Sequence, residues 1–110
     1  MIDPKLLRGS LDTIILKLLD EHDEMYGYEM TQHVKELTKG QIKITEGALY
    51  PALHRLESKG VLSVDIRNAG NRMRKYYRLT PSGKTEVTAR LSAMHDFIQS
   101  IHLIINPKLT

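Results

Sequence analysis

The chain has 110 residues, of which 41% are hydrophobic and 26% are charged, and its formal net charge is +3. This composition excludes a disordered or fibrous chain, and the length fits one domain. The absence of cysteine excludes disulfides and the usual cysteine-based zinc sites. No apolar run approaches the ~20 residues of a membrane span, and the N-terminus does not resemble a signal peptide, so we expect a cytoplasmic protein.

Two helices are predicted in the N-terminal part of the chain. Apolar residues recur at steps of three and four, which predicts an amphipathic helix over roughly 6–21. A second helix is expected over about 27–38, and Gly40 stands where a left-handed cap would follow it. The inward stripe of this second helix consists of Met30, Val34 and Leu37.

A third helix is predicted over about 46–59. Thr45 is its expected N-cap, and Glu46 faces the positive end of the helix dipole in the first turn. Pro51 lacks an N–H and crowds the preceding turn, so we expect a bend or a loosened first turn but not a break. The inward stripe consists of three leucines, Leu49, Leu53 and Leu56.

A β-hairpin follows the third helix. Residues alternate over 61–66 and 72–79, and a turn cluster at 68–71 separates the two runs. Three helices, a hairpin and a last helix predict a mainly α fold with a small β-hairpin, a winged helix-turn-helix. We expect this region over 1–79 and a long C-terminal helix over 80–110, within one compact domain.

The outward face of the third helix suits contact with DNA. At about 100° per residue, the face opposite the leucines is small or polar, and a helix fits the major groove with its N-terminal residues near the bases. The plainer alternatives are a half-buried Tyr50, a surface His54, and an Arg55 that pairs with a neighbouring glutamate or lies in solvent. The candidate recognition-helix residues are Thr45, Glu46, Gly47, Tyr50, Pro51, His54 and Arg55.

The hairpin is the most basic part of the sequence. The stretch from Arg67 to Arg78 holds five basic side chains and no acidic one, which indicates either a solvated surface or a footprint for a polyanion. Two further alternatives are a winged helix that contacts an acidic protein and an architectural DNA binder without a preferred site. The candidate phosphate-binding residues of the wing are Arg67, Asn71, Arg72, Arg74 and Lys75.

Catalysis is not indicated by the sequence. It has no Gly-rich phosphate loop and no His-Glu-x-x-His spacing, its five histidines are scattered, and no acidic pair is placed for acid–base work. We therefore predict no catalytic residue, no cofactor and no metal site.

Four segments resemble the signatures of one family, the PadR family of bacterial transcriptional regulators. The segment EGALYPALHRLE resembles its recognition-helix motif, and the resemblance accounts for Pro51, because the family carries a proline at the matching place. Met73 departs from the basic or polar residue usual in the family's wing, which predicts a slightly weaker phosphate grip. The four segments are 8–12, 26–29, 46–57 and 74–80, and the resemblance covers about 6–105.

The resemblance implies a homodimeric repressor that binds an inverted-repeat operator. In the last helix, apolar residues at steps of 4, 3, 4, 3 and 4 form a heptad-like seam. A small domain cannot bury this wide face alone, so we expect it to meet a second subunit with help from the first helix; the alternative is an intramolecular core helix. The predicted interface residues are Leu11, Ile15, Val87, Leu91, Met94, Ile98, Ile101 and Ile105.

A small-molecule effector is a further implication of the resemblance. Some short members bind flat aromatic or drug-like compounds at the dimer interface, between aromatic residues of the last helix. Met94 lies where such members carry an aromatic residue, and Phe97 is about one turn further along. These two residues would line an effector pocket; the alternative is that both are ordinary core residues.

Overall fold

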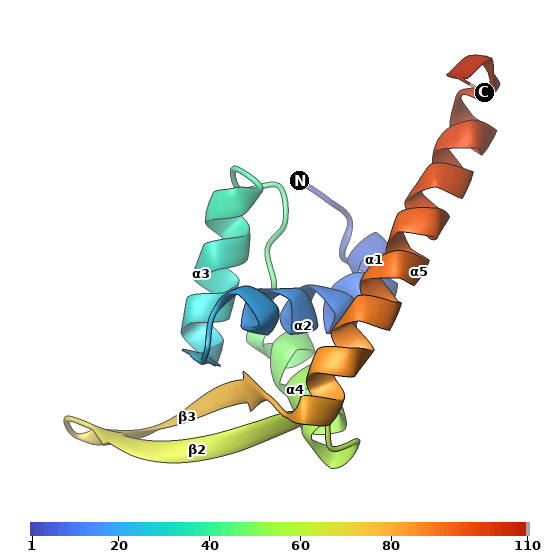
Figure 1. Ribbon diagram of the computed structural model, residues 1–110. Coiled ribbons are helices and arrows are strands. Elements are labelled where there is room, and N and C mark those ends of the chain that lie inside the picture. The colour runs from blue at the N-terminus through green and yellow to red at the C-terminus, as the bar shows by residue number, and fades with distance from the viewer. Residues whose placement is uncertain (110) are drawn as a thin grey trace.

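A computed structural model describes residues 1–109, and of Leu109 only the backbone. The predicted fold class is confirmed: helices dominate, a hairpin forms the wing, and a long helix ends the fold (Figure 1). In chain order the elements are α1 Pro4–Leu7, the 3-10 turn η1 Arg8–Ser10, α2 Leu11–Glu21, β1 Met25–Tyr26, α3 Gly27–Leu37, α4 Glu46–Ser58, β2 Leu62–Ala69, β3 Arg72–Leu79, α5 Pro81–Ile105 and the 3-10 turn η2 Pro107–Leu109.

The first helical segment differs from its prediction. Instead of one helix over 6–21, the chain forms α1, then η1, then α2. The Asp3 carboxylate caps α1 by accepting the N–H of Lys5 at 2.9 Å, and Gly9, a poor helix former, lies in η1. The helices α3 and α4 begin and end within about one residue of their predicted bounds, and α5 begins at Pro81 and ends at Ile105, within the predicted C-terminal region 80–110. None of the helices formed by residues 1–109 is long and apolar enough to span a membrane.

The core lies around α2, which crosses the middle of the molecule (Figure 1) and packs against α4 and the first half of α5. The α2 side chains Ile15 and Leu16 are fully buried, as are the three leucines of the predicted α4 stripe. The inward position predicted for Leu37 was wrong, because this residue ends α3 and is 65% exposed.

The sheet has three antiparallel strands in the order β1-β3-β2. The sequence analysis missed β1, which is two residues long and pairs Met25 with Tyr77 and Tyr26 with Tyr76. The wing turn is shorter than predicted, because Ala69 pairs with Arg72 and leaves a two-residue turn. Its first residue is Gly70 at φ +68°, a left-handed conformation that glycine adopts without steric cost.

The wing and the last helix leave the core in opposite directions (Figure 1). Both start from a joint at which Thr80 caps α5 by accepting the Gly83 N–H at 3.0 Å. The Thr80 hydroxyl also donates to the Gly60 carbonyl at 2.7 Å, which ties the start of α5 to the end of α4. The molecule is therefore elongated, with extents of 56 × 30 × 21 Å.

Candidate nucleic-acid interface

The helix α4 is a regular helix with one polar face. Thr45 is its N-cap, as predicted, and its hydroxyl accepts the Ala48 N–H at 3.3 Å. Pro51 lies inside an uninterrupted helix, so the expectation that it would not break the helix is confirmed. The inner face of α4 packs against the core through the buried side chains Leu49, Ala52, Leu53 and Leu56.

The outer face of α4 is an exposed ridge with two flanks. At about 100° per residue, the flank toward the wing carries Tyr50 and the opposite flank carries Arg55, both exposed. The ridge between them, which is also exposed, consists of Gly47, Pro51, His54 and Ser58. Because the side chains near the start of the helix are small and one imidazole follows further along, another molecule's surface can approach the α4 backbone closely.

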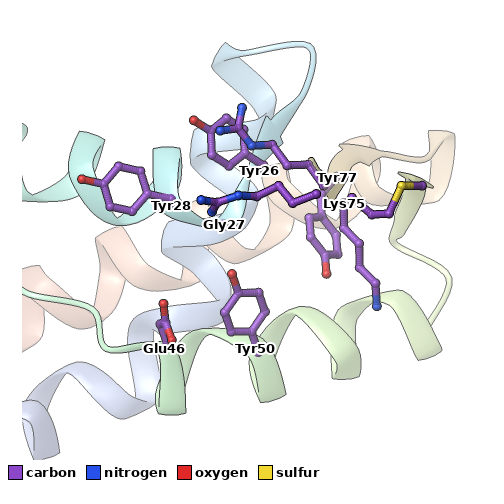
Figure 2. A pocket seen from close by; sticks show the side chains of 10 residues that line it. Tyr26, Gly27, Tyr28, Glu46, Tyr50, Lys75 and Tyr77 are labelled. Atoms are coloured by element: carbon purple, nitrogen blue, oxygen red, sulfur yellow. The ribbon is translucent and has the colours of Figure 1, made fainter. Parts of the chain in front are cut away.

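A groove of about 680 Å³ runs between α4, the start of α3 and the wing strand β3 (Figure 2). Figure 2 shows Tyr50 rising from α4 toward Gly27, with Glu46 beside it in the first turn. A Cβ on residue 27 would lie 2.7 Å from the Tyr50 hydroxyl oxygen, so this glycine makes room for the tyrosine. The lining residues are Tyr26, Gly27, Tyr28, Glu46, Tyr50, Arg72, Met73, Arg74, Lys75 and Tyr77.

Two of the predicted phosphate-binding cations in this groove are unpaired. Arg72 and Lys75 are exposed, and neither forms an ion pair within residues 1–109. Arg74 is different, because its guanidinium lies 4.3 Å above the Tyr26 ring and is half-buried. A hydrogen bond with Tyr76 raises the pKa of Arg74. Asn71 is exposed in the turn at the tip of the wing.

Arg67 is engaged by the protein itself. Its guanidinium donates to both carboxylate oxygens of Glu24, at 2.9 and 2.6 Å, and to Asp65 at 2.8 Å. It also lies 4.5 Å above the Tyr76 ring, and Arg78 donates to Glu24 at 3.2 Å. The run that carries no acid in sequence is thus partly neutralised by Glu24, which lies in the loop between α2 and β1. A phosphate would have to displace Glu24 to reach Arg67.

Arg55 has an acidic partner, but it is Asp12 on α2 and not the neighbouring glutamate of the plainer alternative. Its guanidinium donates to the Asp12 carboxylate at 3.1 Å. Arg90 of α5 approaches the other oxygen of Asp12 at 3.9 Å, so one carboxylate on α2 connects α4 with α5. Half of the Arg55 side chain remains exposed.

The predicted subunit interface requires a correction. Leu11, Ile15 and Val87 are 4%, 0% and 2% exposed, because they lie in the hydrophobic core of their own chain. These three assignments were wrong, since a side chain covered by its own core cannot contact a partner. Leu91 and Met94 are partly buried, whereas Ile98, Ile101 and Ile105 are exposed.

The two predicted effector-pocket residues share a cavity. Met94 and Phe97 line a space of about 550 Å³ between α5 and the N-terminal segment. The Ser10 hydroxyl donates to the Met94 sulfur at 4.0 Å, and Arg90 lies at the same cavity. Within residues 1–109, no cluster of three or more metal-ligating side chains is present.

The sequence analysis did not assign three residues that line cavities beside α4. Tyr28 is 62% exposed at the start of α3 and lines the wing-side groove. Arg8 and Lys43 line a second cavity, together with Gly47 and Arg55. A signal for Lys43 was present, since it lies two residues before the N-cap and opens the basic segment 43–78.

Comparisons with known proteins agree on one family. Residues 15–89 match the model of the Transcriptional regulator PadR-like family. An uncharacterised protein of Lysinibacillus sphaericus is 41% identical over 87 residues, which are 76% of this chain and 77% of that one. The transcriptional regulator Rv3488 of Mycobacterium tuberculosis is 34% identical over 79 residues, 72% of this chain and 71% of that one.

Solved structures give the same result. A transcriptional regulator from Clostridium thermocellum superposes with a TM-score of 0.81 at 33% identity, covering 89% of this chain and 95% of that chain. A PadR family transcriptional regulator from Eggerthella lenta has a TM-score of 0.79 at 29% identity, covering 93% of this chain and 87% of that chain.

Proposed function

The chain belongs to the PadR-like family of transcriptional regulators, and from this premise we propose that it is a homodimeric repressor of a palindromic operator. Members of this family are DNA-binding regulators that are typically dimeric, and they are not enzymes. In the proposal, α4 reads the major groove, the wing binds the phosphate backbone, and a small effector releases the DNA.

The observation that carries the proposal is the exposed ridge of α4 beside the basic groove. A helix of this width enters the major groove of B-DNA, which is about 12 Å wide. The His54 imidazole on the ridge then faces base edges, and the exposed part of the Tyr50 ring, whose hydroxyl end lies beside Gly27, borders them on the wing side. The unpaired cations Arg72 and Lys75 face phosphates. Amides at Glu46 and Gly47, at the start of α4, add donors for a phosphate.

The dimer is supported by the exposed apolar face of α5. Residues 95–105 extend beyond the rest of the molecule (Figure 1) and are all exposed. Ile104 and Ile105 are 74% and 76% exposed, which is a large apolar area for a chain to leave in water. A second copy of α5 would cover it, and the two recognition helices would then lie one DNA turn apart, about 34 Å.

The effector proposal is supported by the cavity at Met94 and Phe97. A thioether and a ring suit a flat aromatic or drug-like compound. Arg90 lines this cavity and also approaches Asp12, the carboxylate that holds Arg55 of the recognition helix. An effector that moves Arg90 would therefore change the position of Arg55.

The test is the substitution His54→Ala, measured by fluorescence anisotropy. The DNA is a duplex from upstream of the protein's own gene, with a scrambled duplex of equal length for comparison. Loss of a base contact costs about 1–3 kcal/mol, so operator affinity should fall about 5- to 150-fold and scrambled affinity should stay unchanged. Ser58→Ala, near the C-terminal end of the same ridge, is the matched control.

Equal losses on the two duplexes would remove His54 from base readout. If the unmodified protein binds neither duplex at any salt concentration, the proposed function fails. The remaining interpretation would then be a winged helix that binds an acidic protein. In that case the basic wing would bind polyglutamate and not DNA.

A further inference from the structure

A second basic cavity lies on the other flank of the recognition helix. It has a volume of about 430 Å³ and lies between the N-terminal segment, the loop before α4 and α4 itself. Arg8 reaches it from η1, Lys43 from the loop, and Arg55 from α4. No aspartate or glutamate lines this cavity, so every charged side chain in its lining is basic.

Two of these three cations are free to bind an anion. Arg8 and Lys43 are exposed, and neither has an acidic side chain within 4 Å in the part of the chain that the structure describes. Arg55 is held by Asp12. A pair of unpaired cations in one concave site is attractive for a phosphate, because no internal carboxylate has to be displaced.

The position of this cavity relative to the wing matters. Tyr50 and Glu46 border the wing-side groove, whereas Ala48 and Arg55 border the second cavity. At about 100° per residue, these two pairs lie on opposite sides of α4, with the outward ridge between them. A helix lying in the major groove has one phosphate backbone on each side of it.

We propose that Arg8 and Lys43 bind the DNA phosphate backbone that lies opposite the wing, so that α4 is held from both sides. This inference rests on the proposed function and adds a contact that the wing cannot make. The wing cations bind one strand, and Arg8 and Lys43 bind the other. Both contacts are to phosphates. The contact of Arg8 and Lys43 therefore adds affinity and fixes the orientation of α4 on the DNA, but it does not distinguish base sequences.

The test is the salt dependence of DNA binding by Arg8→Gln, Lys43→Gln and the double variant. Glutamine keeps part of the stem of each side chain and removes the charge. Each lost phosphate contact should lower the slope of log affinity against log salt by about one unit, and the double variant by about two. The loss should be the same on the upstream duplex and on the scrambled one.

Two further variants make the result specific. Lys108→Gln removes the same charge in η2, beyond the end of α5, and its slope should equal that of the unmodified protein. Arg72→Gln removes an unpaired cation of the wing and should lower the slope by about one unit. Thermal unfolding of each variant confirms that the fold is retained.

The proposed phosphate contact of Arg8 and Lys43 is overturned if the salt slopes of Arg8→Gln and Lys43→Gln both equal that of Lys108→Gln while Arg72→Gln still lowers the slope. That outcome leaves the proposed function standing. Absence of DNA binding by the unmodified protein would overturn both.

Discussion

The wing and the projecting half of α5, residues 95–105, extend from the same core and differ in how they are stabilised. The wing is largely polar, and several of its charged and aromatic side chains, Arg67, Arg74 and Tyr76 among them, find partners within the chain. The projecting half of α5 is apolar on one face and has no cover (Figure 1). The wing is stabilised by contacts within its own chain, whereas the projecting half of α5 presents an apolar surface that a second chain would cover.

The partners of the wing form a continuous series. Arg67 lies over Tyr76, the Tyr76 ring meets Tyr26 edge-on at 5.5 Å, and Arg74 lies over Tyr26. Glu24, in the loop between α2 and β1, then accepts hydrogen bonds from Arg67. Cation–π contacts of this kind contribute about 0.5–1 kcal/mol each at exposed sites. The series stabilises the wing as far out as the Arg67–Arg74 pair and leaves the last two residue pairs and the turn outside it.

The largest expected effect is on the apolar extension. In the variant Ile98→Glu, a charge replaces a side chain that is 58% exposed in the free chain and that a partner would bury. An uncompensated buried charge costs about 3–5 kcal/mol, so the dimer dissociation constant should rise at least about a hundredfold. Sedimentation velocity over a concentration series measures this change.

Gln99→Glu is the matched control for Ile98→Glu. It introduces the same carboxylate one residue further on, on the side of the helix that faces away from the apolar face. It should leave the dimer intact. A dimer that survives Ile98→Glu unchanged would end the contrast between the two extensions, because residues 95–105 would then not be a docking surface.

The next effect is expected at the joint from which both extensions start. Gly83 is buried in the first turn of α5, and a Cβ there would overlap the Val61 carbonyl oxygen. Backbone atoms cannot swing aside as a side chain does, so Gly83→Ala should lower the free energy of unfolding by about 1–3 kcal/mol. Urea unfolding monitored by circular dichroism measures the loss.

Gly47→Ala provides the comparison for Gly83→Ala. It also lies in the first turn of a helix, but a Cβ there meets nothing within 4 Å. Alanine favours a helix over glycine by up to about 1 kcal/mol, so this variant should be neutral or more stable. Equal stability of the two variants would show that the joint tolerates a side chain and is not tightly packed.

The fold could be predicted from the sequence because its signals are local. The caps Thr45 and Thr80, the leucine stripe of α4 and the alternation of the wing each depend on neighbours in the chain. The strand β1 was missed because two residues carry no periodicity. Leu11, Ile15 and Val87 were misassigned because apolar spacing marks a buried face without saying whether the cover comes from the same chain.

The candidate site could be predicted only in part, for a related reason. The basic run from Arg67 to Arg78 is visible in the sequence, but its partner Glu24 lies 43 and 54 positions away from those residues. The Asp12 partner of Arg55 is equally distant in sequence, at 43 positions. Charge patterning along a chain shows how many cations a segment carries. The number of these cations that are available to DNA depends on carboxylates from distant parts of the chain, which only the fold brings near them.

The smallest expected effect concerns Glu24, which completes the wing. Hydrogen bonds from Arg67 hold the pKa of the Glu24 carboxyl below its ordinary value of 4.5. A carboxyl with a lowered pKa in the folded state contributes stability above its ordinary pKa and loses it as the pH falls through the lower folded value. Glu24→Gln should therefore melt below the unmodified protein at pH 7, and the difference should disappear under acid conditions.

Asp23→Asn separates the ion pairs from the loss of a charge. Asp23 is the exposed neighbour of Glu24 and forms no ion pair with any residue of the described chain, so its variant should melt like the unmodified protein at every pH. Amide hydrogen exchange should report faster opening of β2 and β3 in Glu24→Gln and unchanged exchange in the core of α2. If Glu24→Gln instead behaves like Asp23→Asn, the backbone ladder alone holds the wing. The contrast with α5 would then lie in strand pairing, and the charged and aromatic series along the wing would add nothing measurable.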